Sequence, residues 1–341
     1  MEINDFAKYK QDLLNEIKAL YEKQDLFAVI KKLENSELDF DLCNELVRAY
    51  INAANKTSDP YSLFEKANIL LDKFSTQGKD NPKHLFYRGY ILFKQGLIED
   101  SKIRFERALR FASISDGILF NQITTMLSNA NDLIAQAAFK GVDDKSKQEL
   151  LDHIKKSFGT PEHLCSFNQV ALYRVAPNDK HGYNLLVSVG LSGKTQPSKN
   201  GGVESCEICL SLPKDYKFNP DSKSNFEIYL LIEVIRHLIA ESNSIGFGYY
   251  LEKESGFSQR TAFNGAMLIG MGEYTKEEQS ITLLNNVQVS FLELLPLRPM
   301  ELNFRKSHSA LELLDLFKEK LILITPFIST RDDVCMKVME K

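Results

Sequence analysis

Two short segments carry residues whose types and spacing could do chemistry. Residues 188–195 read Ser-Val-Gly-Leu-Ser-Gly-Lys-Thr and end as a phosphate-binding loop does. Such a loop requires Gly where Ser188 stands and a helix directly after the Thr, whose N-terminal amides hold the phosphate. Residues 196–202 instead read Gln-Pro-Ser-Lys-Asn-Gly-Gly, which is typical of a flexible loop. The sequence therefore predicts a strand with a long hairpin connection, and no cofactor-binding residues.

The second segment is Cys206-x-x-Cys209, a spacing found in zinc and thiol redox sites. No second pair of this kind and no nearby pair of histidines completes four ligands. In a strand, residues three apart point to opposite faces, so the two sulfur atoms diverge. His163 and Cys165 also lack further ligands. We expect buried or half-buried thiols and no metal.

Catalysis has no visible candidate. The chain contains no Gly-x-Ser-x-Gly, HExxH or GxGxxG motif. The six histidines are scattered, and the carboxylate pairs Asp143-Asp144 and Asp332-Asp333 are typical of solvated turns. We expect no catalytic residues and no enzyme, although an enzyme whose site is assembled from distant residues stays open as an alternative.

Composition narrows the class of protein. The 341 residues carry a net charge of −4, and 43% hydrophobic residues are enough for packed cores. Neither half is basic, which disfavours nucleic acid as a partner. The first five residues do not resemble a signal peptide, and no uncharged apolar stretch is long enough for a membrane span. Five sparse cysteines are typical of reduced thiols. We expect a cytoplasmic protein without membrane or nucleic-acid partners.

The elements change character near residue 150. From residue 6 to 139 the apolar residues recur every three or four positions, which predicts a string of antiparallel amphipathic helices. Beyond residue 160 they alternate, as in residues 183–192, 204–212 and 287–291, and residues 321–325 predict a further strand. Helices are expected at 226–242 and 310–318. We predict a helical domain at 1–150 and an α+β domain at 158–341, with the boundary between 140 and 157.

The helical part contains an internal repeat. Residues 82–115 place Gly89 for close helix approach, Gly96 for the inter-helix turn, and Phe105 with Ala108 to pack the second helix onto the first. This spacing resembles the tetratricopeptide repeat (TPR), although Ser101 and Ser113 depart from its pattern. An upstream copy has its matching small and apolar residues at Ala49, Ala67, Leu71 and Phe74. The resemblance implies a TPR-like α-solenoid.

The TPR resemblance also implies a surface for a protein partner. Its ligand-facing positions, counted from Pro82, fall on three aromatic residues with flanking lysines: Lys83, Phe86, Tyr90, Phe93 and Lys94. Exposed aromatic residues anchor interfaces, and scattered charges steer association. The alternative is that these rings pack against Leu46 and Tyr50, or against the second domain.

Four stretches in order give the second part its own resemblance: residues 186–192, residues 207–213 ending in Leu-Pro, the long helix followed by Gly246-Phe247-Gly248, and residues 289–297 followed by Glu301-Leu302 and a closing helix. Together they resemble the suppressor-of-fused domain family over residues 167–317. Relatives often have Trp before the long helix and Gly-His after it, where this chain has Phe226 and Gly246-Phe247.

The suppressor-of-fused resemblance implies a non-catalytic, cytoplasmic regulatory protein that binds another protein. The animal member is a repressor of transcription factors, and bacterial members are thought to include immunity proteins that neutralise a partner. A bacterial immunity-type or regulatory protein is therefore the favoured interpretation. A scaffold in which only the TPR-like repeats bind a partner is the alternative.

Overall fold

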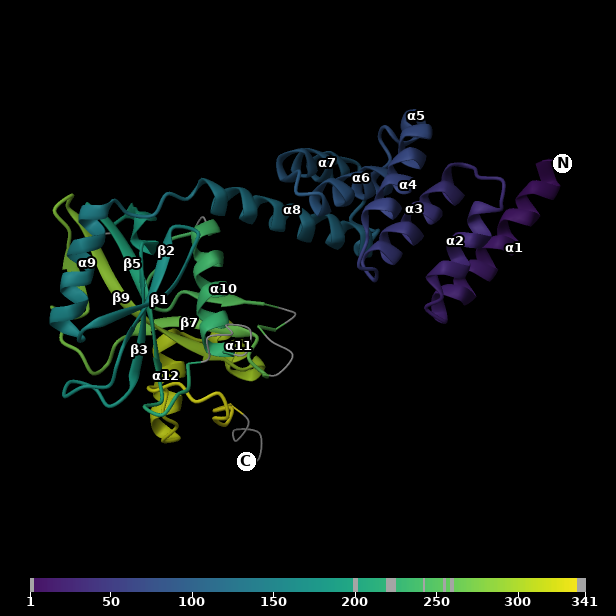
Figure 1. Cartoon of the computed structure of the whole chain (residues 1–341). Coiled ribbons are helices and arrows are strands. Elements are labelled where there is room, and N and C mark those ends of the chain that lie inside the picture. Colours follow the sequence, from purple (N-terminus) through teal and green to yellow (C-terminus); the bar gives the residue numbers. More distant parts are fainter. Residues whose placement is uncertain are drawn as a thin grey trace. The chain divides into compact units, whose positions relative to one another are not determined.

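The structure is a computed structural model that describes residues 3–198, 202–218, 225–241, 243–253, 256–257 and 261–335. Its Cα positions divide the chain into two compact units between Ile134 and Ala135. The first unit is helical, and the second is built around a mixed β-sheet (Figure 1). This arrangement confirms the predicted order of a helical region followed by an α+β domain.

The helical unit consists of short helices that pack as consecutive antiparallel pairs. They are α1 (Ile3–Glu22), α2 (Leu26–Glu34), α3 (Phe40–Ala54), α4 (Tyr61–Lys73), α5 (Ser75–Gly78), α6 (Pro82–Lys94), α7 (Ile98–Phe111) and α8 (Gly117–Ala138), and α8 continues through the division between the units. Asn81 begins α6 as its N-cap, because its side chain accepts a hydrogen bond from the backbone N–H of His84.

The α6–α7 pair packs as the repeat predicts. A Cβ atom at Gly89 would lie 2.7 Å from the ring of Phe105, so only glycine lets the two helices approach this closely. Gly96 joins them with a φ of +81°, in the left-handed region that favours glycine. Phe105 and Ala108 are fully buried, as are Ala49, Ala67 and Leu71 of the α3–α4 pair. The predicted packing is confirmed, and the TPR identity of the repeats stays an interpretation.

The second unit consists of one β-sheet with helices packed against it. Its elements are α9 (Asp144–Ser157), β1 (Pro161–Phe167), β2 (Val170–Val175), β3 (Asn184–Val189), β4 (Gln196–Pro197), β5 (Val203–Leu212), α10 (Phe226–Ala240), β6 (Tyr250–Glu252), β7 (Gly265–Gly270), β8 (Ser280–Thr282), β9 (Val287–Leu297), α11 (Pro299–Ser307) and α12 (Ala310–Glu319). The strand order is β1-β2-β3-β5-β9-β7-β6, and β4 and β8 pair with β5 and β9.

The two faces of the sheet carry separate cores. The central strands β5 and β9 run parallel to each other, and their neighbours are antiparallel. Alternate residues of these strands, such as Ile208 and Leu294, pack with α10 on one face. On the other face, Phe291 packs with residues of α9, and Leu295 packs with residues of α12. The helices α9 and α12 thus cover the same face of the sheet, and there is space between the two cores that they form with it.

The structure differs from two expectations. Leu150 and Ile154 of α9 are fully buried in the core of the sheet, and the two compact units meet at 134/135, ahead of the expected boundary between 140 and 157. The polar residues before α9 resembled a linker, but the amphipathic helix after them packs on the sheet. Residues 321–325 form no strand, because Leu321 turns the chain at the end of α12 with a φ of +55° and no ladder of backbone hydrogen bonds follows it.

None of the helices in the described ranges combines the length and the apolar character that a membrane span needs.

Candidate protein-binding site

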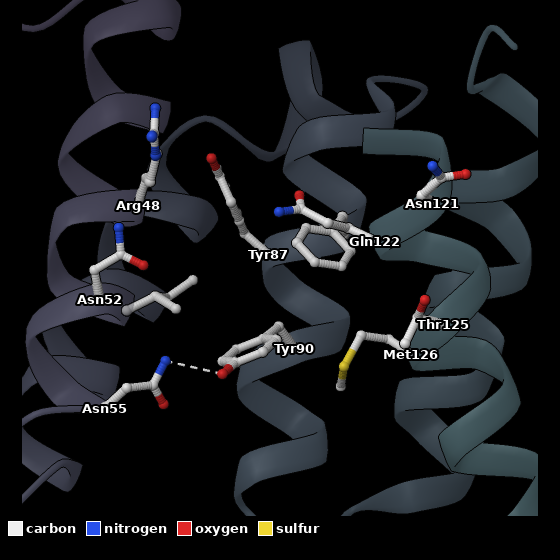
Figure 2. A pocket seen from close by; sticks show the side chains of 11 residues that line it. Arg48, Asn52, Asn55, Tyr87, Tyr90, Asn121, Gln122, Thr125 and Met126 are labelled. Atoms are coloured by element: carbon white, nitrogen blue, oxygen red, sulfur yellow. Dashed lines mark hydrogen bonds between the residues drawn. The ribbon is translucent and has the colours of Figure 1, made fainter. Parts of the chain in front are cut away.

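An open groove lies between α3, α6 and α8 of the helical unit, with a volume of about 430 Å³. Figure 2 shows Arg48, Asn52 and Asn55 of the α3 side facing Tyr87 and Tyr90 of α6, with Gln122 and Met126 of α8 beyond them. Its lining residues are Arg48, Ile51, Asn52, Asn55, Phe86, Tyr87, Tyr90, Asn121, Gln122, Thr125 and Met126. Three helices thus form one concave surface.

The structure brings two of the five predicted contact residues into this groove. Phe86 and Tyr90 line it, although Phe86 is only 7% exposed and packs against Phe105. Phe93 is half-buried against the helical core and does not line the groove. The ring of Phe86 is therefore chiefly a core residue, whereas Tyr90 presents its hydroxyl to the groove and accepts a hydrogen bond from Asn55 at 2.9 Å.

The two predicted lysines lie outside the groove. The Nζ atom of Lys83 is bound to the Glu45 carboxylate at 2.6 Å, and that of Lys94 lies 5.4 Å from the centre of the Tyr90 ring. The cation that lines the groove is Arg48 of α3. Its guanidinium stacks over Tyr21 at 4.7 Å and lies 3.4 Å from Glu45. Glu45 is shared between Arg48 and Lys83, so it neutralises the Arg48 charge only in part.

Tyr87 lines the groove, although its position in the repeat did not predict this. Its side chain is only 7% exposed, yet its hydroxyl points into the groove between Arg48 and Gln122 (Figure 2). Burial raises the pKa of Tyr87, so the hydroxyl keeps its proton and can donate. No other described residue forms a hydrogen bond with it. The hydroxyl oxygen reaches the groove, so it can bond to water or to a bound molecule.

The polar lining is dominated by carboxamides. Asn52, Asn55, Asn121 and Gln122 come from two helices on opposite sides of the groove. A carboxamide carries one acceptor and two donors, which matches the hydrogen-bonding groups of a peptide backbone. Ile51, Phe86 and Met126 provide apolar contacts between them. The groove can therefore hold an extended main chain with an apolar side chain, and an acidic group near Arg48.

The segment that ends in Gly-Lys-Thr has an internal structural role. The hydroxyl of Ser188 donates to the Glu207 carboxylate at 2.5 Å, and the backbone N–H groups of Gly190 and Ser192 donate at 2.9 and 3.0 Å. Lys194 donates to the carbonyl of Ile239 at the end of α10. A 3-10 turn and β4 follow β3, and residues 199–201 of the expected connection lie outside the described residues.

Cys206 and Cys209 are both buried in β5 and pack in different cores, Cys206 with α10 and Cys209 with α9. The prediction that their sulfur atoms point to opposite faces is confirmed. Within the ranges that the structure describes, no group of three or more His, Cys, Asp or Glu side chains is arranged to hold a metal ion.

Part of the second unit matches a known protein family. Residues 167–326 match the family described as "Suppressor of fused protein (SUFU)". No curated protein sequence matches the chain.

Solved structures related to this family share low sequence identity with the chain. A putative SUFU homolog from Neisseria gonorrhoeae FA 1090 is 17% identical, with 55% of this chain and 96% of that chain covered and a TM-score of 0.41. A chain of the Sufu-Fu complex is 13% identical, with 59% and 96% covered and a TM-score of 0.43. Drosophila Suppressor of Fused is 12% identical, with 57% and 52% covered and a TM-score of 0.43.

Proposed function

Since residues 167–326 form a suppressor-of-fused domain, we propose that this chain is a non-catalytic regulatory protein whose helical unit binds another protein. The observation that carries the proposal is the groove between α3, α6 and α8, with the hydroxyl of Tyr87 pointing into it. Tyrosine is enriched among the residues that contribute most to binding energy at protein interfaces.

We propose that the groove takes an extended segment of its partner. The carboxamides of Asn52 and Gln122 would bond to its backbone from both sides, which requires no particular side-chain sequence. Selectivity would come from an acidic group near Arg48 and from an apolar side chain against Ile51 and Met126. This binding mode uses preformed polar groups on helices, so little ordering of the groove itself is needed.

The suppressor-of-fused domain would supply a second binding surface. The related chain in the Sufu-Fu complex is assembled with a protein partner, and we extend this property to the present chain. The scaffold alternative, in which only the repeats bind, predicts that the sheet unit is dispensable for capture. We further propose a bacterial immunity-type role, in which binding itself neutralises the partner in the cytoplasm. The five cysteines are free thiols, which fits a reducing compartment.

The groove is tested with peptides selected from a random phage library on the full-length protein. We expect Tyr87→Phe and Asn52→Ala each to weaken a selected peptide by about five- to tenfold, the magnitude of one lost hydrogen bond. Tyr61→Phe and Asn129→Ala are matched controls, because both residues are exposed and lie outside the groove. Fluorescence anisotropy gives the Kd values. Equal affinities for all four variants would exclude the groove as the binding site.

A further inference from the structure

The described residues of the sheet unit include four buried carboxyl groups, those of Glu207, Glu293, Glu301 and Asp333. Asp333 accepts a hydrogen bond from the backbone N–H of Cys335 at 2.9 Å, and two of the other three have partners that explain their burial. Glu207 accepts hydrogen bonds from both Ser188 and Ser192 and from two backbone N–H groups. Glu301 forms a two-point ion pair with Arg331, at 2.5 and 2.7 Å. Burying a charge is costly unless it is paired or fully hydrogen-bonded, and both groups meet that requirement.

Glu293 is hydrogen-bonded but takes part in no ion pair among the described residues. It lies in β9 and is only 4% exposed, and its Oε2 atom accepts a hydrogen bond from the Thr325 hydroxyl at 3.0 Å. The side chain and the backbone N–H of Ser211 also lie beside this carboxyl, and hydrogen bonding from them lowers the pKa of Glu293. No lysine or arginine among the described residues pairs with Glu293. Glu293 is thus a buried, hydrogen-bonded carboxyl group without a cationic partner among the described residues.

The position of Glu293 in the sheet shows where a cationic partner for its carboxyl group would lie. Because side chains alternate along a strand, Phe291, Glu293 and Leu295 share one face of β9. Phe291 belongs to the core under α9, and Leu295 belongs to the core under α12. Glu293 therefore lies between the two cores, where the face of the sheet is not filled.

A cavity of about 340 Å³ occupies this position, and Glu293 lines it. Its walls are mainly apolar, with Ile269, Leu314 and Ile324 among the aliphatic residues and the rings of Tyr183, Tyr274 and Phe317. The volume lies within the range of small-ligand pockets. Aromatic rings next to a carboxylate attract a cation both through the ring faces and through the charge.

We propose that this cavity binds an alkylammonium group, with the ammonium on the Glu293 carboxylate and the aliphatic chain against Ile269, Leu314 and Ile324. A free primary amine and the lysine side chain of a partner protein share this chemistry. The ammonium would provide the counter-ion that Glu293 lacks and donors for the hydroxyl of Ser211. The site is separate from the groove of the helical unit, so it does not depend on the function proposed above.

The protonation state of Glu293 determines how the cavity would bind a cation. Burial raises the pKa of Glu293 to about 7, with the nearby Glu273 adding to the effect and hydrogen bonding opposing it. The other groups that face it are Tyr183, Tyr274 and Cys209, whose pKa values burial also raises, and Lys318 at the exposed end of α12. Near neutral pH Glu293 is therefore the group among these that changes charge. Binding of an ammonium would convert it to the carboxylate and release its proton to the buffer.

Calorimetry of the full-length protein with n-pentylamine tests the proposal, and n-pentanol is the neutral comparison. At pH 8 we expect the amine to bind at least tenfold more tightly than the alcohol. Between pH 8 and pH 6 the amine affinity should fall about tenfold, because the ionised fraction of a group with a pKa near 7 changes by that factor. Titrations at pH 7 in phosphate and in Tris should show release of about 0.5 proton per amine.

Two variants test whether amine binding depends on the charge of Glu293. Glu293→Gln should weaken pentylamine at least tenfold at pH 8, and Glu277→Gln, at an exposed acid that does not line the cavity, should change it less than threefold. A Gly-Lys-Gly peptide that binds more tightly than pentylamine would identify a partner's lysine as the source, and the reverse would identify a free amine. Equal binding of amine and alcohol, no detectable amine binding, no proton release, or an unaffected Glu293→Gln protein would each overturn the proposal. The wild-type proton release decides the question even if that variant does not fold.

Discussion

Replacing Arg331 with methionine should destabilise the sheet unit severely. The guanidinium is 4% exposed and its partner Glu301 is fully buried. It also donates to the carbonyl of Pro296 at 2.8 Å and lies over the rings of Phe263 and Phe317. Methionine preserves most of the aliphatic contact with these rings but removes every donor. Glu301 would then be a buried charge without its cation.

The expected cost is about 3–5 kcal/mol, the range found when one partner of a buried ion pair is removed. Glu301 would keep the backbone N–H groups of Arg298 and Val334, at 2.9 and 3.0 Å, which places the cost within that range and not above it. Adding Glu301→Gln to Arg331→Met removes the unpaired charge and keeps an acceptor oxygen. We therefore expect the double variant to recover about 1–2 kcal/mol.

Hydrogen exchange at increasing urea concentration, read on peptides from β7 and β9, measures unfolding of the sheet unit separately from the helical unit. Lys306→Met is the matched control, because Lys306 forms a half-exposed pair with Glu252 at 2.7 Å and should cost at most about 1 kcal/mol. If Arg331→Met costs no more than this control, or if the double variant is less stable than Arg331→Met, the buried pair does not stabilise the unit as argued.

Three further predictions concern other parts of the chain. Gly89→Ala should lower the free energy of unfolding by about 1–3 kcal/mol despite the better helix propensity of alanine, because the added Cβ would lie 2.7 Å from Phe105. Thermal melting measures this effect. An unchanged Tm would show that α6 and α7 can separate freely. The pKa of Glu293 is about 7 in the folded chain and about 4.3 in an unfolded one, so the folded chain binds this proton more tightly. Wild type should therefore lose stability relative to Glu293→Gln as the pH rises from about 4 to 7, by at most about 3 kcal/mol, in urea titrations at each pH; a difference independent of pH would contradict the raised pKa. The fragment 135–341 should be soluble and fold independently. The fragment 158–341 should aggregate, because it lacks Leu150 and Ile154 of α9. Equal solubility of the two fragments would support the boundary expected from the sequence.

The sequence predicted best what depends on residues close together along the chain. Gly89, Gly96 and Phe105 lie within one helical pair, and their spacing alone indicated the close approach that the structure shows. The opposite orientation of Cys206 and Cys209 followed from the alternation of one strand. These predictions succeeded because one element, or two neighbouring elements, determine the geometry.

Features that depend on distant elements were missed. The groove requires α8 beside α3, about 70 residues away, so Tyr87 could not be recognised as a groove residue from its repeat position. The pairing of Arg331 with Glu301 depends on how the chain returns after α12. Two signals were nevertheless present in the sequence. Leu150, Ile154 and Phe158 recur every four residues, and Glu293 is a lone acid on the buried face of an otherwise apolar strand.

The central claim is that the groove between α3, α6 and α8 binds an extended segment of a partner protein. Photocrosslinking in the cells that make the protein tests it most directly, with p-benzoylphenylalanine placed at Gln122 in the groove or at Tyr61 outside it. The account predicts one crosslinked partner from position 122, joined through a short contiguous peptide and lost when Arg48→Ala is added, and no crosslink from position 61. Crosslinks from position 61 alone, or a position-122 product unaffected by Arg48→Ala, would contradict it.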